Sequence, residues 1–151
     1  MPHISLYSPV GDITVFEDEG AIVALDWGWV GDQTPTPLLE RARDQLDAYF
    51  DGALKDFDLP LAPNGTPYQQ AVWRALCAIP YGQTRNYLDI AKSAGGSPRS
   101  VGQANGRNPI PLIIPCHRVV ATSHIGGYSG GEGLPTKRWL LALECPTQTL
   151  L

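Results

Sequence analysis

Cys116 and His117 are adjacent, and together they could carry out nucleophilic chemistry. A cysteine attacks as the thiolate, and a neighbouring imidazole or other base favours that form. Both follow Ile110–Pro115, an apolar and uncharged segment that we expect to be buried. Polar groups at the end of a buried segment need partners. Two generic hypotheses follow, a catalytic Cys–His pair as in a cysteine hydrolase and a small core cysteine. In a strand, the two side chains would point to opposite faces.

The other cysteines are weaker candidates. Cys77 lies beside Leu76 and Ile79 on a predicted helix, so we expect it to be a core residue. Cys145 follows the last predicted helix. Three cysteines without a Cys-x-x-Cys pair fit neither a disulfide framework nor a zinc ribbon. We therefore expect no metal site built on these cysteines, and a reducing cytoplasm as the setting.

Two short helices are predicted upstream of this segment, at Asn86–Ser93 and Pro98–Asn105, with a Gly-Gly-Ser turn between them. This pattern is typical of a helix-turn-helix, whose second helix enters a DNA groove. Arg99 stands in the first turn of the second helix, where the helix dipole does not favour a cation, so a ligand explains it better. The residues after it are small or neutral. An ordinary helical hairpin packed in the core is the alternative.

The charge distribution supports a polyanionic partner. The net charge is −4, but residues 1–66 carry twelve acidic and three basic residues, a balance of −9. Residues 67–151 carry three acidic and eight basic residues, a balance of +5. Phosphate neutralisation by such bases dominates DNA affinity, so the second half is expected to contact DNA. Two differently solvated faces are the alternative.

The Pro- and Gly-rich connector Pro60–Pro67 predicts two domains in the 151 residues, a small N-terminal α/β domain over 1–62 and a C-terminal domain over 66–151. In the first we expect strands at His3–Ser8, Gly11–Glu19, Ala21–Trp29 and Asp56–Ala62, and a helix at Thr36–Phe50. In the second we expect a helix capped by Thr66 and a last helix at Trp139–Glu144. We see no signal peptide and no membrane-spanning segment.

The motif Pro115–Val119, preceded by Asn105–Pro109 and followed by Gly127–Gly131, resembles the active site of the O6-alkylguanine-DNA alkyltransferases, the methylated-DNA–protein-cysteine methyltransferases. The resemblance extends from about Gly65 to Glu144. It implies an α+β fold, with a small ribonuclease-H-like sheet-plus-helix domain followed by a mostly helical, winged-helix-like domain that contains the helix-turn-helix.

The resemblance also implies roles for single residues. Cys116 matches the cysteine that accepts the alkyl group irreversibly, and His117 the histidine that takes the thiol proton through a water. Glu144 matches the carboxylate that orients this histidine. Asn108 matches the asparagine that braces the active-site turn, and Tyr87 the tyrosine that assists nucleotide rotation and contacts the base.

Further matched positions face the DNA and the base. Arg99 matches the arginine that enters the stack in place of the flipped nucleotide, on a helix presented to the minor groove. The backbone carbonyls of Val119 and Cys116 match those that read the guanine amino group. The remaining residues expected at the DNA are Ser97, Gly102, Gln103, Ala104 and Asn105, and those expected to close the base pocket are Tyr128, Ser129 and Gly130.

The implied function is DNA repair by a single-turnover, stoichiometric transfer of the alkyl group from O6-alkylguanine in double-stranded DNA to Cys116. Whether O4-alkylthymine is also a substrate is left open by the sequence. The expected protein is a monomer without cofactor, in the cytoplasm or in a eukaryotic nucleus. The alternative is a non-catalytic lesion-binding relative, but such relatives lack the cysteine. Ala121–Gly127 is shorter and Glu132–Thr136 longer than in mammalian members, which leaves the preferred alkyl size open.

Overall fold

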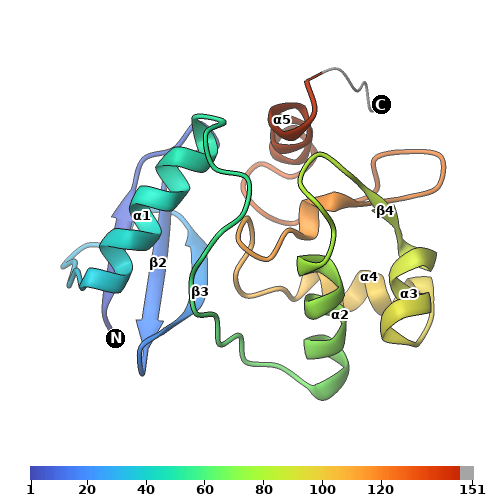
Figure 1. Ribbon diagram of the computed structural model, residues 1–151, viewed down its shortest axis with the longest axis horizontal. Coiled ribbons are helices and arrows are strands. Elements are labelled where there is room, and N and C mark those ends of the chain that lie inside the picture. The colour runs from blue at the N-terminus through green and yellow to red at the C-terminus, as the bar shows by residue number, and fades with distance from the viewer. Residues whose placement is uncertain (147–151) are drawn as a thin grey trace. The chain divides into compact units, whose positions relative to one another are not determined.

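The computed structural model describes residues 1–146 and divides the chain into two compact units, one from Met1 to Asn64 and one that begins at Gly65. Figure 1 shows the first unit in blue to green and the second in green to red. The predicted α+β class is confirmed. In the described part of the chain, no helix is long and apolar enough to cross a membrane.

The first unit is an antiparallel sheet covered on one face by a helix. Strands β1 (His3–Leu6), β2 (Ile13–Asp18) and β3 (Ala21–Trp27) pair in the order β1-β2-β3. The register sets Ile4 opposite Val15 and Leu6 opposite Ile13, so the alternating apolar residues share one buried face. Helix α1 (Pro37–Phe50) lies against β1 and β2 (Figure 1).

The start of α1 follows the sequence signals. The Thr36 hydroxyl accepts a hydrogen bond from the Leu39 N–H at 3.1 Å, and Pro37 occupies the first helical position. The strand expected at Asp56–Ala62 is wrong. Only Leu61 forms a bridge, parallel to Ile22, because Pro60 has no N–H with which to extend a ladder.

The second unit is mostly helical. It contains helices α2 (Pro67–Cys77), α3 (Tyr87–Ala94), α4 (Pro98–Gly106) and α5 (Leu134–Glu144), and the short strands β4 (Arg85–Asn86) and β5 (Val119–Val120). Helices α2, α3 and α4 pack against one another around Val72, Leu76, Ile90 and Val101. Each of the three begins with a capping box, at Thr66, Asn86 and Ser97 respectively.

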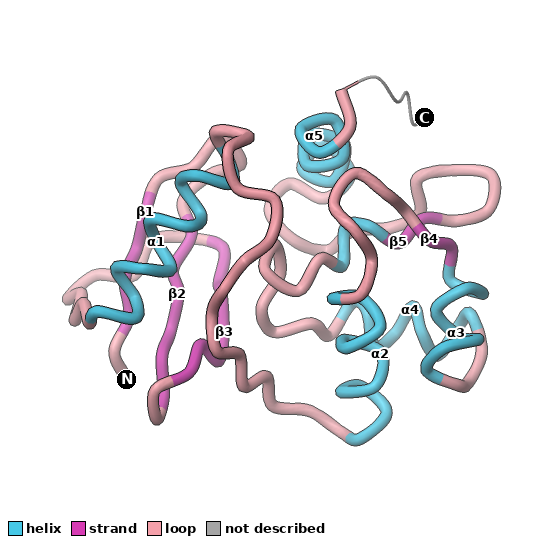
Figure 2. Tube along the Cα trace, in the orientation of Figure 1, coloured by secondary structure: helices cyan, strands magenta, loops and turns pink. Residues whose placement is uncertain are grey.

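Helices α3 and α4 form the predicted helix-turn-helix, with Gly95 and Gly96 in the turn, both at positive φ. The Trp73 indole N–H donates to the Ala104 carbonyl at 2.9 Å and ties α4 to α2. Strand β5 pairs in parallel with β4, and β4 directly precedes α3 in the chain (Figure 2). The segment that follows the buried chain Ile110–Pro115 is therefore joined to the start of the helix-turn-helix.

Two expectations for this unit are wrong. Cys77 was expected in the core, but it is exposed on α2. The last helix begins at Leu134, not at Trp139, because Pro135 suits the first turn of a helix. Gly133 occupies the N-cap position at positive φ, and no side chain caps this helix. The segment Cys116–Arg118 is a 3₁₀ turn and not part of a strand. Its side chains therefore do not alternate between two faces.

Candidate active site

Cys116 is a buried thiol, with 6% of the residue exposed. Its backbone N–H donates to the Ile114 carbonyl at 2.8 Å, which holds the tight turn that presents the sulfur. Burial raises the pKa of the Cys116 thiol above its ordinary value. Hydrogen bonds from Asn108 and Tyr128 and the positive charge of Lys137 act in the opposite direction and favour the thiolate.

Asn108, two residues after the end of α4, contacts the turn that leads to Cys116. Its Nδ2 donates to the Ile114 carbonyl at 2.8 Å, and its Oδ1 accepts from the Ile110 N–H at 2.9 Å. Both halves of the amide are thus used on the backbone of the segment that leads to Cys116. Asn108 therefore ties the Ile110 and Ile114 backbone groups together through two hydrogen bonds.

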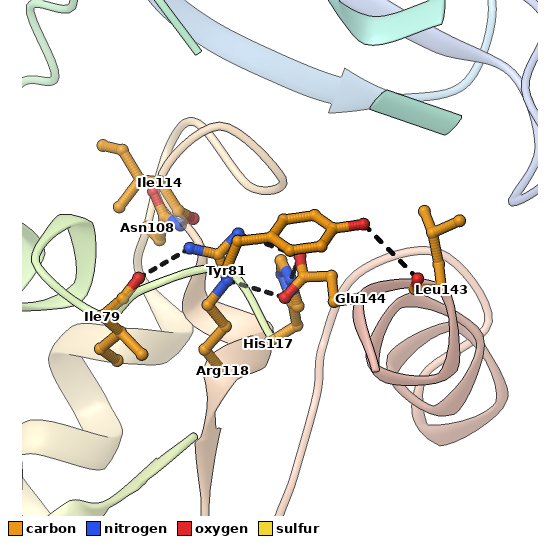
Figure 3. A network of polar contacts seen from close by, with 8 residues as sticks. All are labelled: Ile79, Tyr81, Asn108, Ile114, His117, Arg118, Leu143 and Glu144. Atoms are coloured by element: carbon orange, nitrogen blue, oxygen red, sulfur yellow. Dashed lines mark hydrogen bonds and ion pairs between the residues drawn. The ribbon is translucent and has the colours of Figure 1, made fainter. Parts of the chain in front are cut away.

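His117 is fully buried and is hydrogen-bonded to a carboxylate. Its Nε2 lies 2.7 Å from Oε2 of Glu144, on the last turn of α5 (Figure 3). Because the carboxylate accepts, Nε2 carries the proton in the neutral ring, and Nδ1 keeps its lone pair. Among the described residues, Nδ1 has no hydrogen-bond partner. The ring is therefore oriented to accept a proton at Nδ1.

Arg118 completes this network. Its Nε and Nη2 donate to the two carboxylate oxygens of Glu144 at 2.8 and 3.1 Å, and its Nη1 donates to the Ile79 carbonyl at 2.8 Å (Figure 3). The guanidinium also lies over the ring of Tyr81, 5.7 Å from its centroid. Burial alone would raise the pKa of Glu144, but the hydrogen bonds and charges of His117 and Arg118 outweigh it and hold that pKa at about 2.

Lys137 is a second buried cation that the sequence reasoning did not single out. It is 0% exposed, and its Nζ donates to the carbonyls of Val119 at 2.6 Å and Gly127 at 3.0 Å. Burial lowers its pKa to about 8. A signal for it existed, because Lys137, Leu140, Leu141 and Glu144 recur at the spacing of one helix face. A lysine on an apolar stripe indicates a buried, partnered cation.

A pocket of about 310 Å³ opens onto the sulfur. This volume lies in the range of small-molecule sites, roughly 300–1,000 Å³. The pocket is lined by Tyr87, Gly102, Asn105, Gly106, Cys116, Gly127, Tyr128 and Ser129. A larger cavity of about 410 Å³ beside α2 and α3 holds neither cysteine nor histidine in its wall, so we place the site at the smaller one.

Several expected residues meet at this pocket, and others lie behind it. Tyr87, Gly102, Asn105, Tyr128 and Ser129 line it together with Cys116. Burial raises the pKa of the Tyr128 hydroxyl, as does the nearby Cys116 sulfur. Val119 and Gly130 are buried and are not part of the wall.

The residues expected at the DNA differ in exposure. Arg99 and Gln103 are exposed on α4, whereas Ser97 caps this helix through its hydroxyl. Ala104 is buried, so its side chain faces the core. Asn105 is also buried, and its Nδ2 donates to the Cys116 carbonyl at 3.3 Å. In the described part of the chain, no group of three or more histidine, cysteine or acidic residues could hold a metal ion.

Two family models match nearly the whole chain. The model described as "6-O-methylguanine DNA methyltransferase, ribonuclease-like domain" matches residues 3–63, and "6-O-methylguanine DNA methyltransferase, DNA binding domain" matches residues 67–145. The ribonuclease-like description agrees with the predicted fold of the first domain.

Relatives of known name are similar over most of their length. A methylated-DNA–protein-cysteine methyltransferase of Methanosarcina barkeri is 46% identical over 148 residues, which cover 91% of this chain and 92% of the relative. The constitutive methylated-DNA–protein-cysteine methyltransferase of Bacillus subtilis is 44% identical, with 91% of each chain covered.

Solved structures are similar as well. The crystal structure of Mycobacterium tuberculosis OGT in complex with DNA superposes with a TM-score of 0.85 at 42% identity, and the match covers 95% of this chain and 93% of that one. An O6-methylguanine DNA methyltransferase from Methanococcus jannaschii gives a TM-score of 0.69 at 28% identity, with 97% and 95% covered.

Proposed function

The chain belongs to the 6-O-methylguanine DNA methyltransferase family, and from this premise we propose how its own residues carry out the reaction. It binds DNA and repairs it by transferring an alkyl group to a cysteine of its own chain. The questions that remain are which cysteine accepts the group, which residues activate it, and which residues bring the base to it.

Cys116 is the acceptor. The observation that carries this assignment is the combination of a nucleophile in the wall of a base-sized pocket with a buried base next to it in the chain. Cys77 is exposed on α2, and Cys145 follows α5; neither lines this pocket. The non-catalytic alternative is not favoured, because Cys116 is present.

The proton of the thiol goes to His117. Its Nδ1 has an open lone pair, and the ion pair with Glu144 stabilises the imidazolium that forms. Arg118 keeps Glu144 ionised and in place. The resulting thiolate attacks the alkyl carbon of O6-alkylguanine, so that a C–S bond forms and the C–O bond breaks. The electron pair of the broken bond leaves on the guanine oxygen.

The departing guanine carries negative charge, and donors in the pocket stabilise it. The Tyr87 hydroxyl and the backbone N–H groups of the loop residues Tyr128 and Ser129 are the candidate donors. Lys137 holds this loop through the Gly127 carbonyl and holds the Val119 carbonyl at the same time. The thioether has no route back to a thiol, so each molecule acts once.

DNA meets the protein at α4. Its small residues allow a close approach to the minor groove, and the exposed Arg99 enters the stack where the nucleotide has left. The protein itself leaves room for a Cβ at Gly102, which would make only ordinary van der Waals contact with the Tyr87 ring, at 3.8 Å. We infer a reducing, DNA-containing compartment, the cytoplasm or a eukaryotic nucleus, because the acceptor must stay a free thiol.

The central test uses duplex DNA with radiolabelled O6-methylguanine. We expect one equivalent of label on the protein, lost in Cys116→Ala and retained in the matched controls Cys77→Ala and Cys145→Ala. Tight lesion binding without transfer would instead indicate a non-catalytic binder. More than one product per protein molecule would indicate a hydrolase.

A second prediction concerns Arg99. Arg99→Ala should slow transfer from duplex DNA by roughly ten- to a hundredfold, because an inserted side chain offsets unstacking worth a few kcal/mol. Its reaction with free O6-benzylguanine should change little, since a free base needs no flipping. Equal losses on the two substrates would rule out the stacking role.

A further inference from the structure

The hydroxyl of Tyr68 holds the turn of the helix-turn-helix from both sides. Tyr68 is a half-buried residue in the first turn of α2. Its hydroxyl donates to the Gly95 carbonyl at 3.0 Å and lies 2.8 Å from the Ser100 hydroxyl oxygen. Gly95 caps the end of α3, and Ser100 stands in the first turn of α4. One phenol therefore connects a third helix to both arms of the turn.

The turn between α3 and α4 has little rigidity of its own. Gly95 and Gly96 both lie at positive φ, a region that glycine enters and leaves without steric cost. A Cβ at Gly96 would lie 2.5 Å from the Tyr68 and Ser100 hydroxyl oxygens, so the phenol packs directly on this glycine. The hydrogen bonds of Tyr68 thus restrain a joint that the two glycines would otherwise leave free to move.

The Ser100 hydroxyl passes this restraint on to the first turn of α4. It accepts from the Ser97 backbone N–H at 2.9 Å, while the Ser97 hydroxyl accepts from the Ser100 N–H at 3.2 Å. The first N–H groups of a helix have no partners within the helix, so the order of this turn depends on such bonds. With Ser100 donating to Tyr68 and Tyr68 donating to Gly95, each of the two hydroxyl protons has one acceptor.

Arg99 lies between the two serines and depends on this turn for its position. It is exposed, and its side chain makes no hydrogen bond or ion pair with any residue that the structure describes. The backbone of the first turn of α4 is therefore what sets the place of the Arg99 side chain. A group that is already held where its partner needs it avoids the entropic cost of becoming ordered on binding.

We propose that Tyr68 is a positioning residue for Arg99, whose hydroxyl holds the turn between α3 and α4 in the arrangement in which Arg99 enters the DNA stack. This inference rests on the proposed function, in which Arg99 takes the place of the flipped nucleotide. Without the hydroxyl, the first turn of α4 must become ordered as DNA binds, and this cost slows flipping. Tyr68 is not part of the wall of the Cys116 pocket, so the chemical step does not use it.

The test is a double-mutant cycle on duplex DNA that carries radiolabelled O6-methylguanine, with the second-order rate constant of transfer as the measured quantity. Tyr68→Phe keeps the ring and removes the hydroxyl. In the protein that has Arg99, this change should slow transfer about threefold to tenfold, the effect of one hydrogen bond. In the Arg99→Ala background, it should change the rate by less than about twofold, because the side chain that it positions is absent.

Two controls separate positioning from general support of the fold. Tyr7→Phe also removes a hydroxyl, from an exposed tyrosine of the first unit, and should leave the rate on duplex DNA unchanged. Tyr68→Phe should react with free O6-benzylguanine as fast as the unaltered protein does, since a free base needs no flipping. Thermal unfolding establishes that each variant is folded.

The outcomes are distinct. Equal slowing by Tyr68→Phe in the two backgrounds, an equal loss on the free base, or no slowing at all would overturn the proposal. An Arg99→Ala variant as fast as wild type on duplex DNA would overturn it too, by removing the stacking role on which it rests. A wild-type protein that accepts no label from O6-methylguanine would overturn the proposed function itself.

Discussion

Arg118 joins three segments that are far apart in the sequence. Its guanidinium binds both oxygens of Glu144 on α5 and the Ile79 carbonyl after α2, while its backbone belongs to the turn that carries Cys116. Breaking a buried ion pair by removing one partner leaves an uncompensated charge. Glu144 would then have His117 as its remaining strong partner among the contacts described above.

This predicts a large effect of Arg118→Met on stability. The free energy of unfolding should fall by about 3–5 kcal/mol, as measured by urea denaturation. The double variant Arg118→Met/Glu144→Gln should be less destabilised than the sum of the two single variants, because it removes both buried charges. Additive losses would show that the pair is not coupled.

Glu144 also makes stability depend on pH. Its pKa is held at about 2 in the folded protein, below the ordinary 4.5, so the unfolded chain takes up the proton first as pH falls. The stabilisation is complete above the unfolded value and is lost as pH falls from 4.5 toward about 2. Between about pH 5 and pH 3, wild-type stability should therefore fall more steeply than that of Glu144→Gln. Parallel pH profiles in urea denaturation would contradict this.

Residue types and order single out the candidate nucleophile, its neighbouring candidate base and Asn108, but not every partner of these residues. Cys116, His117 and Asn108 stand in one short motif, where local sequence is informative. The contacts of Arg118 and Lys137 go to backbone carbonyls of distant segments. Every residue has such a carbonyl, so the sequence contains no mark that selects these partners.

Secondary structure was predicted best where its signals are local. Helices α2, α3 and α4 each begin at a side chain that caps its own first turn, and each was expected within a residue or two of its observed start. Helix α5 has no side-chain cap, and its start was placed five residues late. The failed strand at Asp56–Ala62 depended on pairing with β3, which local residues do not reveal.

The turn between α3 and α4 offers a matched pair of glycines. Both have positive φ, but a Cβ at Gly95 would meet nothing within 4 Å, whereas one at Gly96 would lie 2.5 Å from the Ser100 and Tyr68 hydroxyl oxygens. Gly96→Ala should therefore cost about 1–3 kcal/mol more stability than Gly95→Ala, the usual cost of overpacking. Thermal denaturation of the two variants measures the difference. Equal losses would show that the turn adapts and that only the backbone conformation matters.

At the scale of the whole molecule, the total charge of −4 is less informative than its distribution. Each unit has its own balance, and the second unit carries the excess of basic residues together with the pocket and α4. DNA affinity that depends on phosphate contacts falls steeply with salt. The acidic first unit consists of a sheet covered by α1, and it contains no cysteine.

This predicts a charge effect confined to the second unit. Binding to undamaged duplex DNA should weaken steeply as salt rises, and Arg107→Ala, at the exposed end of α4, should reduce the slope of log K against log salt by about one. Lys55→Ala, in the first unit, is the matched control and should leave the slope unchanged. Equal effects of the two variants would contradict a role limited to the second unit.

The burial of Cys116 has a consequence for how long the protein remains usable. A protein that acts once must not lose its thiol to oxidants or alkylating agents in the surrounding solution. The sulfur is nearly closed to solvent, and burial raises the pKa of the thiol, which disfavours the reactive thiolate. Cys77, which is exposed, meets such reagents first. Burial thus protects the thiol of a protein that can react only once, so that the thiol is still available when the protein meets damaged DNA.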